Sequence, residues 1–239
     1  MFQLSNLDII SSAEELNRIP QDKCLVNTVN ANSYNVAQRD ETFAQALIEG
    51  DFLLPDGASI VKACRWLGAK SQPRERVAGW DLFCFLMRRN ATGRVFFLGS
   101  SPQVLEKIRE RCSRDFPQMQ VDVYSPPYKP EFSEADNAAM IEAVNRAAPD
   151  LLWIGMTAPK QEKWAHDHWQ ELHIACPTGT IGAVFDFYAG TVRRAPLFWQ
   201  RHSLEWLYRL LSEPRRMWRR YLIGNPLFIY HIIREKYNR

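Results

Sequence analysis

A carboxylate that follows a predicted strand is the first candidate for chemistry in this chain. Asp56 stands in a Pro-Asp-Gly sequence directly after residues 52–54, a short apolar run that predicts a strand. A carboxylate in that place can take up a proton as a general base or accept a hydrogen bond from a sugar hydroxyl. Pro-Asp-Gly is also an ordinary turn sequence, and in that case Asp56 only shapes the turn.

A hydroxyl and an amide stand in a similar place after another predicted strand. Thr28 and Asn30 lie at the carboxyl end of residues 23–29, a β-rich run. Ligands of open α/β sheets bind at that edge, and these two side chains suit the recognition of sugar hydroxyls. The alternative is that they only cap the end of the strand.

Gly99 and Ser100 begin a Gly-Ser-Ser-Pro turn between a buried strand and a helix. Backbone N–H groups at such a turn bind phosphate well, since the helix dipole also favours an anion. An ordinary strand-to-helix loop is the alternative. The turn lacks the glycine spacing of a dinucleotide fingerprint and the lysine of a P-loop, which argues against a standard dinucleotide oxidoreductase.

Further polar residues precede or open predicted helices. Arg76 lies between a polar loop and an apolar helix, where it can pair with a phosphate or carboxylate or remain a solvated loop residue. Lys160 and Gln161 begin a helix after the strand at residues 150–154. Gln161 suits a uracil edge or a sugar, while Lys160 also fits an ordinary charged first turn.

The last quarter of the chain is strongly basic and aromatic. Residues 193–239 hold eleven Lys and Arg against three Glu, a net charge of +8 in a chain of +3. Arg209, Arg216 and Arg219 are spaced seven and three, which places them on one face of a continuous helix. This pattern favours contact with an anionic membrane surface or ligand. A solvated basic helix packed on the body of the protein is the alternative.

These candidates need a scaffold that brings strand ends together. Strands that alternate with helices predict an α/β fold, Rossmann-like, with a mainly parallel sheet, helices on both faces and a C-terminal helical basic appendage. We expect a core at residues 1–195 and the appendage at residues 196–239. The predicted strands are residues 23–29, 52–54, 94–98, 120–124, 150–154 and 173–176, and the predicted helices are residues 33–48, 58–67, 79–89, 102–114, 133–147, 160–169, 197–211, 215–223 and 227–237.

Several classes of protein are disfavoured. No stretch approaches eighteen uninterrupted apolar residues, and the first twenty residues lack a signal-peptide pattern. Five scattered cysteines indicate buried thiols in a reducing cytoplasm. His166 and His168 have no surrounding cluster of ligands, so we expect no metal site. The modest overall charge and the lack of a nucleic-acid motif predict no nucleic-acid partner.

The chain resembles the WecG/TagA/CpsF family, which is glycosyltransferase family 26. The resemblance covers roughly residues 20 to 225, and its segments are specific jointly rather than singly. They are Asn27-Thr28-Val29-Asn30, residues 54–61 (LPDGASIV), residues 76–82 (RVAGWDL), residues 96–99 (FFLG), residues 155–162 (GMTAPKQE), residues 179–186, and residues 190–196 leading into residues 204–211 (LEWLYRLL).

The resemblance implies an inverting transfer from a UDP-sugar donor to an acceptor linked to undecaprenyl diphosphate. It implies a cytoplasmic protein peripheral on the inner face of the plasma membrane, acting in cell-surface polysaccharide synthesis. The family's base falls on Asp56, and its appendage docks on the membrane and helps to close the active site. Its substrate-binding residues fall on Thr28, Asn30, Arg76, Gln161, Arg209, Arg216 and Arg219.

The leaving UDP must be stabilised as it gains negative charge. The sequence contains no Asp-x-Asp motif, so we expect a metal-independent reaction without a cofactor. Donors near Gly99 and arginines of the appendage would then carry that charge.

Two other functions are alternatives to a glycosyltransferase. A nucleotide-sugar epimerase or dehydrogenase would need a dinucleotide glycine motif that is not evident, and a non-catalytic membrane scaffold would use Asp56 only as a turn residue. The donor sugar and the oligomeric state cannot be read from the sequence, and a homo-oligomer is compatible with it.

Overall fold

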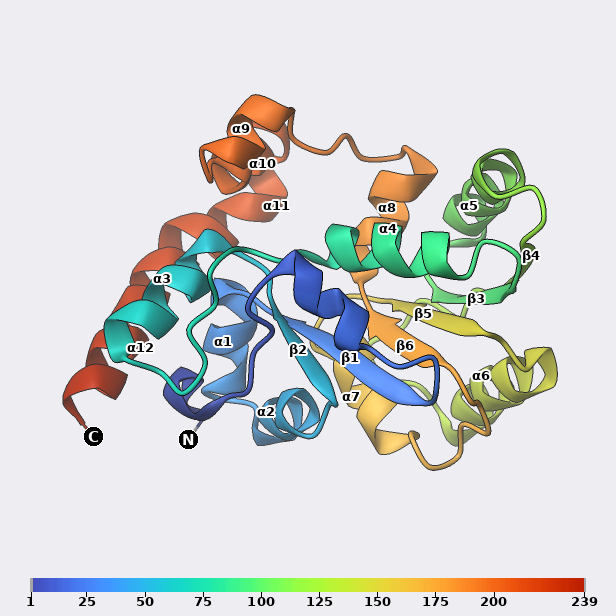
Figure 1. Cartoon of the computed structure of the whole chain (residues 1–239), viewed down its shortest axis with the longest axis horizontal. Helices are drawn as coiled ribbons and strands as arrows, with labels where there is room; N and C mark the ends of the chain where they lie inside the picture. The colour runs from blue at the N-terminus through green and yellow to red at the C-terminus, as the bar shows by residue number, and fades with distance from the viewer. Residues whose placement is uncertain (1, 239) are drawn as a thin grey trace.

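The computed structural model describes residues 2–238, apart from the side chain of Arg201. Met1 and Arg239, at the outer ends of the two predicted domains, lie outside the described residues. Within that range a single six-stranded sheet runs through the molecule in the order β2-β1-β6-β5-β3-β4, and all its pairings are parallel (Figure 1). The strands are β1 (Cys24–Val29), β2 (Phe52–Pro55), β3 (Arg94–Gly99), β4 (Gln120–Tyr124), β5 (Leu151–Gly155) and β6 (Pro177–Thr180).

Helices cover both faces of the sheet, which confirms the predicted α/β class (Figure 1). On one face, Phe97 and Trp153 pack among aromatic side chains such as Phe83 and Phe185. That face is covered by η2 (Ala13–Arg18), α4 (Gly79–Arg89), α5 (Pro102–Asp115) and α8 (Gly182–Ala189). On the other face, α6 (Glu134–Ala147) and α7 (Lys160–Asp167) cover Phe96, Leu98 and Ile154. Strands buried on both faces account for the continuous apolar runs in β3 and β5.

A third apolar cluster lies beyond β2, at the edge of the sheet. It packs Leu53 and Val29 against Phe43, Leu47 and Ile60. Its elements are η1 (Leu4–Asn6), α1 (Ala31–Ala37), α2 (Glu41–Ile48), α3 (Ala58–Leu67) and α12 (Gly224–Tyr237). The N-terminal and C-terminal segments therefore meet in one cluster.

The prediction for the last strand was wrong. Residues 173–176 are irregular, and the strand is instead the Gly-containing segment Pro177–Thr180. Thr178 and Gly179 pair with β1 on one side and β5 on the other. A Cβ on Gly179 would stand 2.3 Å from the Trp153 ring, so packing against that ring requires a glycine here despite its low strand propensity.

Helix boundaries also differ from several predictions. The predicted helix at residues 33–48 is two helices, and Asn30 caps the first. The predicted helix at residues 197–211 breaks at Ser203, whose φ is 59°, into α9 (Leu197–Arg201) and α10 (Glu205–Ser212). Gly224 does not end a helix, because its φ of −65° continues the helical backbone. Pro226 lies in the first turn of α12.

The C-terminal helices differ in how they are held. After α10 come α11 (Pro214–Trp218) and a π-helical turn (Arg219–Ile223) that leads into α12. Phe228 and Ile232 of α12 are buried against the body, and the buried Glu235 carboxylate accepts hydrogen bonds from the backbone N–H groups of Leu4 and Ser5. By contrast, α10, all of whose residues are described, contributes no buried residue. Among the described residues, no helix is both long and apolar enough to span a membrane.

Candidate active site

The carboxyl ends of the strands open into one cavity of about 1890 Å³. Because all six strands are parallel, the residues that follow them meet at the same edge of the sheet. Thr28, Asp56, Ser100, Met156 and Thr180 line the cavity from five different strands or strand ends. The C-terminal helices α10 and α12 complete its wall from the other side.

Most of the residues singled out in the sequence line this cavity. They are Thr28, Asn30, Asp56, Arg76, Ser100, Lys160, Gln161, Arg209 and Arg216. Gly99 and Arg219 are not among the described residues that line it. A Cβ on Gly99 would stand 2.4 Å from the Gly155 carbonyl oxygen, so this glycine permits β3 and β5 to pack closely. The Arg219 guanidinium lies 5.2 Å from the Trp218 ring.

Asp56 begins the turn from β2 to α3. Its backbone N–H donates to the carbonyl of Val29 at 2.9 Å, and Gly57 follows with a φ of 149°, a conformation that favours glycine. Burial raises the pKa of the Asp56 carboxyl, while the nearby Arg76 opposes that shift. A carboxylate with a raised pKa is a better general base near neutral pH than a free Asp.

An ion pair joins the floor of the cavity to α10. Arg76 Nη1 donates to Glu205 Oε2 at 2.5 Å, and both side chains are largely buried. Glu205 Oε1 also lies 3.8 Å from Arg194 Nε, and the Arg194 guanidinium stacks over Trp80. Glu205 therefore holds two cavity arginines with one carboxylate.

Three further arginines enter the cavity from α10, α11 and the π-helical turn. They are Arg209, Arg216 and Arg220. The buried Nε atoms of Arg209 and Arg220 have no hydrogen-bond partner among the described residues. Burial lowers the pKa of Arg220, and Arg209 and Arg216 act in the same direction. Arg216 is exposed and pairs with Glu213. The partly buried Arg209 and Arg220 repel one another, and such cations favour the binding of an anion.

Gln161 is already engaged by the protein. Its Oε1 accepts hydrogen bonds from the backbone N–H groups of Met156 (3.0 Å) and Gly182 (3.1 Å), and its Nε2 donates to Glu162. It thereby joins the segments that follow β5 and β6. Burial raises the pKa of Glu162 to about 7, and Glu162 Oε2 is buried without a partner among the described residues.

Lys160 and Asn30 also have structural partners. Lys160 Nζ donates to the carbonyl of Lys129 and lies 3.5 Å from the Phe132 ring centroid, which fixes the loop after β4 at the cavity rim. Asn30 Oδ1 accepts hydrogen bonds from the backbone N–H groups of Asn32 and Ser33 and so caps α1. The sequence alternative was a cap on the end of the strand; Asn30 instead caps the helix that follows, and its side chain also lines the cavity.

Sequence reasoning missed several residues of the cavity. Glu205 and Arg194 carried no signal, since their partners lie far away in the chain or across the fold. Arg220 replaces Arg219 because the helix changes to a π-helical turn at Arg219. The apolar residues Trp164 and Ala165 indicate that the helix carrying Glu162 is partly buried, and this pattern could have identified Glu162 as a buried carboxyl.

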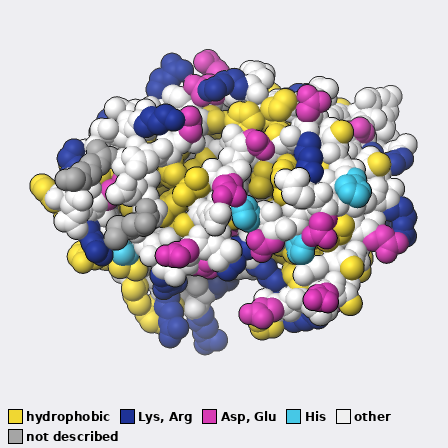
Figure 2. Space-filling model, turned by 90° about the horizontal axis from the view of Figure 1, so that it is seen from below, with side chains coloured by type: hydrophobic (Ala, Val, Ile, Leu, Met, Phe, Trp, Pro, Cys, Tyr) yellow, Lys and Arg dark blue, Asp and Glu magenta, His cyan; other side chains and the backbone are white. Residues whose placement is uncertain are grey.

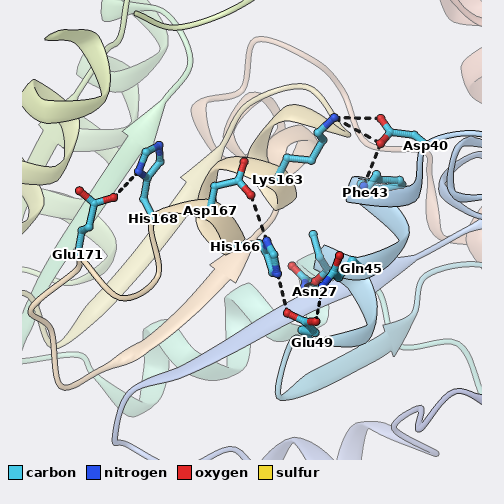
Figure 3. Close-up of polar contacts among 11 residues, drawn as sticks. Asn27, Asp40, Phe43, Gln45, Glu49, Lys163, His166, Asp167, His168 and Glu171 are labelled. Atoms are coloured by element: carbon cyan, nitrogen blue, oxygen red, sulfur yellow. Dashed lines mark hydrogen bonds and ion pairs between the residues drawn. The ribbon is translucent and has the colours of Figure 1, made fainter. Parts of the chain in front are cut away.

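A separate polar cluster joins α2 to α7 (Figure 3). His166 Nε2 lies 2.7 Å from Glu49 Oε2, and Lys163 Nζ lies 3.2 Å from Asp40 Oδ2. These four side chains are not among the described residues that line the large cavity. Among the described residues, no group of three or more His, Cys, Asp or Glu side chains is placed to hold a metal ion.

The chain is similar to known glycosyltransferases along its length. Residues 2–239 match the family model described as Glycosyl transferase WecG/TagA/CpsF family. The chain is 31% identical over 235 residues to an N-acetylglucosaminyldiphosphoundecaprenol N-acetyl-beta-D-mannosaminyltransferase of Bacillus spizizenii, covering 97% of this chain and 88% of that protein. Proteins with the same name from Bacillus subtilis (29% identity, 90% of this chain and 81% of the relative) and Staphylococcus aureus MW2 (25%, 87% and 79%) are also similar. The match along the whole chain confirms the resemblance seen in the sequence, and the protein belongs to the WecG/TagA/CpsF family of glycosyltransferases.

Proposed function

We propose that this glycosyltransferase moves a sugar from a UDP-sugar donor, with inversion, onto a saccharide linked to undecaprenyl diphosphate. The observation that carries the proposal is the Asp56 carboxyl, which lines a large cavity at the carboxyl edge of the sheet and has a raised pKa. The relatives' printed name, with its lipid-linked N-acetylglucosamine acceptor, supports the class of acceptor.

Asp56 acts as the general base in this proposal. Its carboxylate removes the proton from an acceptor hydroxyl as the hydroxyl oxygen forms a bond to the anomeric carbon of the donor. The bond from that carbon to the diphosphate oxygen breaks, and UDP leaves with the electron pair. Attack on the face opposite the leaving group inverts the configuration of the anomeric carbon.

Guanidinium groups stabilise the departing diphosphate. Arg209, Arg216 and Arg220 lie on one wall of the cavity and carry the positive charge that the leaving group needs. The reaction therefore requires no divalent metal in this proposal. Full activity after treatment with EDTA is the expected result, and a loss that Mg²⁺ or Mn²⁺ restores would contradict this part.

The protein works at the inner face of the plasma membrane, in the synthesis of a cell-surface polysaccharide. Most of its exposed large hydrophobic side chains lie after residue 196, near the arginines of the C-terminal helices. Figure 2 shows such hydrophobic and Lys or Arg side chains side by side on the projection at its lower left, at the end of the molecule that carries those helices. This combination suits the headgroup region of an anionic bilayer.

Release of UDP from a panel of UDP-sugars tests the proposal. Purified protein is assayed with and without N-acetylglucosaminyl diphosphate linked to a short prenyl chain. We expect acceptor-dependent release with one donor, and a fall of about a hundredfold or more in Asp56→Asn. Asp51→Asn is the matched control, because Asp51 flanks the other end of β2 and accepts a hydrogen bond from the Leu25 backbone.

The outcomes separate an enzyme from a scaffold. A non-catalytic nucleotide-sugar-binding scaffold would bind UDP but release none from any donor, and Asp56→Asn would then change nothing. Equal turnover in Asp56→Asn and wild type would keep the transferase but remove Asp56 as its base. Failure to bind UDP at all would overturn the proposed donor class.

A further inference from the structure

An apolar trough leaves the cavity between α3 and α12. Its floor consists of the buried side chains of Ala63, Phe228 and Ile232. Its rims are Trp66 of α3 on one side and Ile229 and Ile233 of α12 on the other, all of them exposed. Figure 1 shows the two helices at the same end of the molecule, and they are in contact.

Helical spacing aligns these residues into two facing stripes. On α3, Ser59, Ala63 and Trp66 are four and three residues apart, so they lie on one side of the helix. On α12, Asn225, Ile229 and Ile233 are spaced by four. The α12 stripe spans about 12 Å at the helical rise per residue, which is long enough for a few isoprene units.

On α3 the lining changes from Ser59 and Lys62 to Ala63 and Trp66, and on α12 it changes from Asn225 to Ile229 and Ile233, so both helices become apolar with distance from Asp56. α3 begins two residues after Asp56, so Ser59 lies near the base and Trp66 lies far from it. On α12, Asn225 follows the arginine-bearing turn, and Ile233 lies two helical turns further on. A ligand that fits this gradient has an anionic head beside the arginines and an apolar tail that extends along the trough.

The trough is held at a fixed width. Lys236 of α12 donates from Nζ to the backbone carbonyl of Trp66 at 3.0 Å, at the end of α3. A cation at the C-terminus of a helix is stabilised by the helix dipole. The bond ties the far ends of the two helices together, while Phe228 and Ile232 fill the space beneath. The trough is therefore formed before any ligand enters.

We propose that this trough binds the first isoprene units of the lipid-linked acceptor, an inference that rests on the proposed function. A flat membrane surface would contact exposed apolar side chains without regard to the cavity. The trough is instead continuous with the site that holds Asp56 and the arginines, and its occupant must enter that site with its polar head. A prenyl chain on a diphosphate meets both demands, and the acceptor named for the relatives carries such a chain.

Two isoleucines of similar exposure allow binding in the trough to be distinguished from general contact with a membrane. Ile229 is 57% exposed and lines the cavity, whereas Ile223 is 54% exposed and is not among the described residues that line it. We would measure binding of farnesyl diphosphate and of inorganic diphosphate to the full-length protein by calorimetry, without membranes or detergent. The variants are Ile229→Gln, Ile223→Gln and Ile233→Gln.

We expect wild type to bind farnesyl diphosphate about tenfold or more tightly than inorganic diphosphate, because the chain buries apolar surface. Ile229→Gln and Ile233→Gln should lose most of that advantage and keep their affinity for inorganic diphosphate, while Ile223→Gln should keep both. Equal affinities for the two probes in wild type would overturn the proposal, as would equal losses in Ile229→Gln and Ile223→Gln.

Turnover with prenylated and lipid-free acceptors gives a second readout. Ile229→Gln should raise the KM of the prenylated acceptor and leave kcat and the KM of the lipid-free acceptor unchanged. If wild type binds the prenyl chain but transfers no sugar, the proposed function fails while the trough stands. If it transfers sugar equally well to both acceptors at the same KM, the trough proposal fails while the function stands.

Discussion

Helices α10 and α12 lie in the same basic tail, yet they are held in different ways. α12 buries Phe228, Ile232 and Glu235 in a cluster with the N-terminal segment. α10, described in full, buries no residue and is joined to the body through polar contacts such as the Arg76–Glu205 pair. Buried apolar side chains such as those of α12 contribute several kcal/mol to stability, and α10 has no such contribution.

The difference shows that the positive charge shared by the tail does not determine how firmly each of its helices is held. The tail contains an anchored helix that belongs to the core and a weakly held helix that covers the cavity. Segments held by few buried contacts are those that open at low energetic cost. The cover of the cavity should therefore open at lower energetic cost than the wall that α12 forms.

The largest expected effect is a loss of stability when the buried face of α12 is altered. Phe228→Ala should lower the free energy of unfolding by about 3–5 kcal/mol, since it leaves a cavity beside Tyr34. Leu211→Ala in α10 is the control, because Leu211 is exposed and should change stability by less than about 0.5 kcal/mol. Urea unfolding measures both. Similar values for the two variants would show that α12 is no better anchored than α10.

The next effect is a loss of stability when the buried carboxylate of α12 is altered. Glu235→Gln should cost about 2 kcal/mol, because the charged acceptor for the N–H groups of Leu4 and Ser5 and for the Tyr34 hydroxyl is lost. Glu213→Gln, which removes an exposed pair with Arg216, should cost less than about 0.5 kcal/mol. Thermal unfolding distinguishes them, and an unchanged midpoint for Glu235→Gln would argue against the buried carboxylate as an anchor.

A smaller effect is expected in ligand binding at the weakly held helix. Glu205 occupies Arg76 with a carboxylate, so it competes with an anionic ligand for that guanidinium. Glu205→Gln should bind UDP roughly threefold to tenfold more tightly. Calorimetric titration with UDP measures this. Weaker binding in the variant would mean that Glu205 orients Arg76 for the ligand instead of competing with it.

The smallest effect is a shift in the pH profile. A base must be ionised, so activity should appear as pH rises through the pKa of Asp56, which burial holds above the ordinary Asp value. Glu205 raises the pKa of Asp56 further. Glu205→Gln should therefore move the acid limb of kcat/KM to lower pH, while Glu235→Gln in the anchored helix should leave it in place. A shift to higher pH in Glu205→Gln would contradict this electrostatic link.

The sequence predicted the parts of the fold that local patterns determine. Residues 95–98 and 151–154 are continuous apolar runs, and both lie in central strands. Because the strands are parallel, the polar residues that follow them, such as Asp56 and Ser100, converge on one cavity. The expectation that ligands bind at the carboxyl edge of a parallel sheet therefore identified most residues of the candidate site from the sequence.

The rest depended on contacts between distant segments. Gly179 lies in a strand because the Trp153 ring occupies the space of a side chain, which no local propensity encodes. Arg220 rather than Arg219 lines the cavity because the helix changes to a π-helical turn at Arg219. The Arg76–Glu205 pair joins residues 129 positions apart, so no spacing rule could reveal it.

The bonds from Leu4 and Ser5 to Glu235 also have a consequence for synthesis on the ribosome. The carboxylate that these two amides require is translated 230 or 231 residues after them. At a rate of about 5–20 residues per second, the amides wait roughly ten to fifty seconds for their acceptor. Throughout that interval α1 and α3 lack the helix that packs against them. A chain that ends before residue 228 therefore exposes the apolar side chains that Phe228 and Ile232 would cover, and such a chain is a natural substrate for chaperones and proteases.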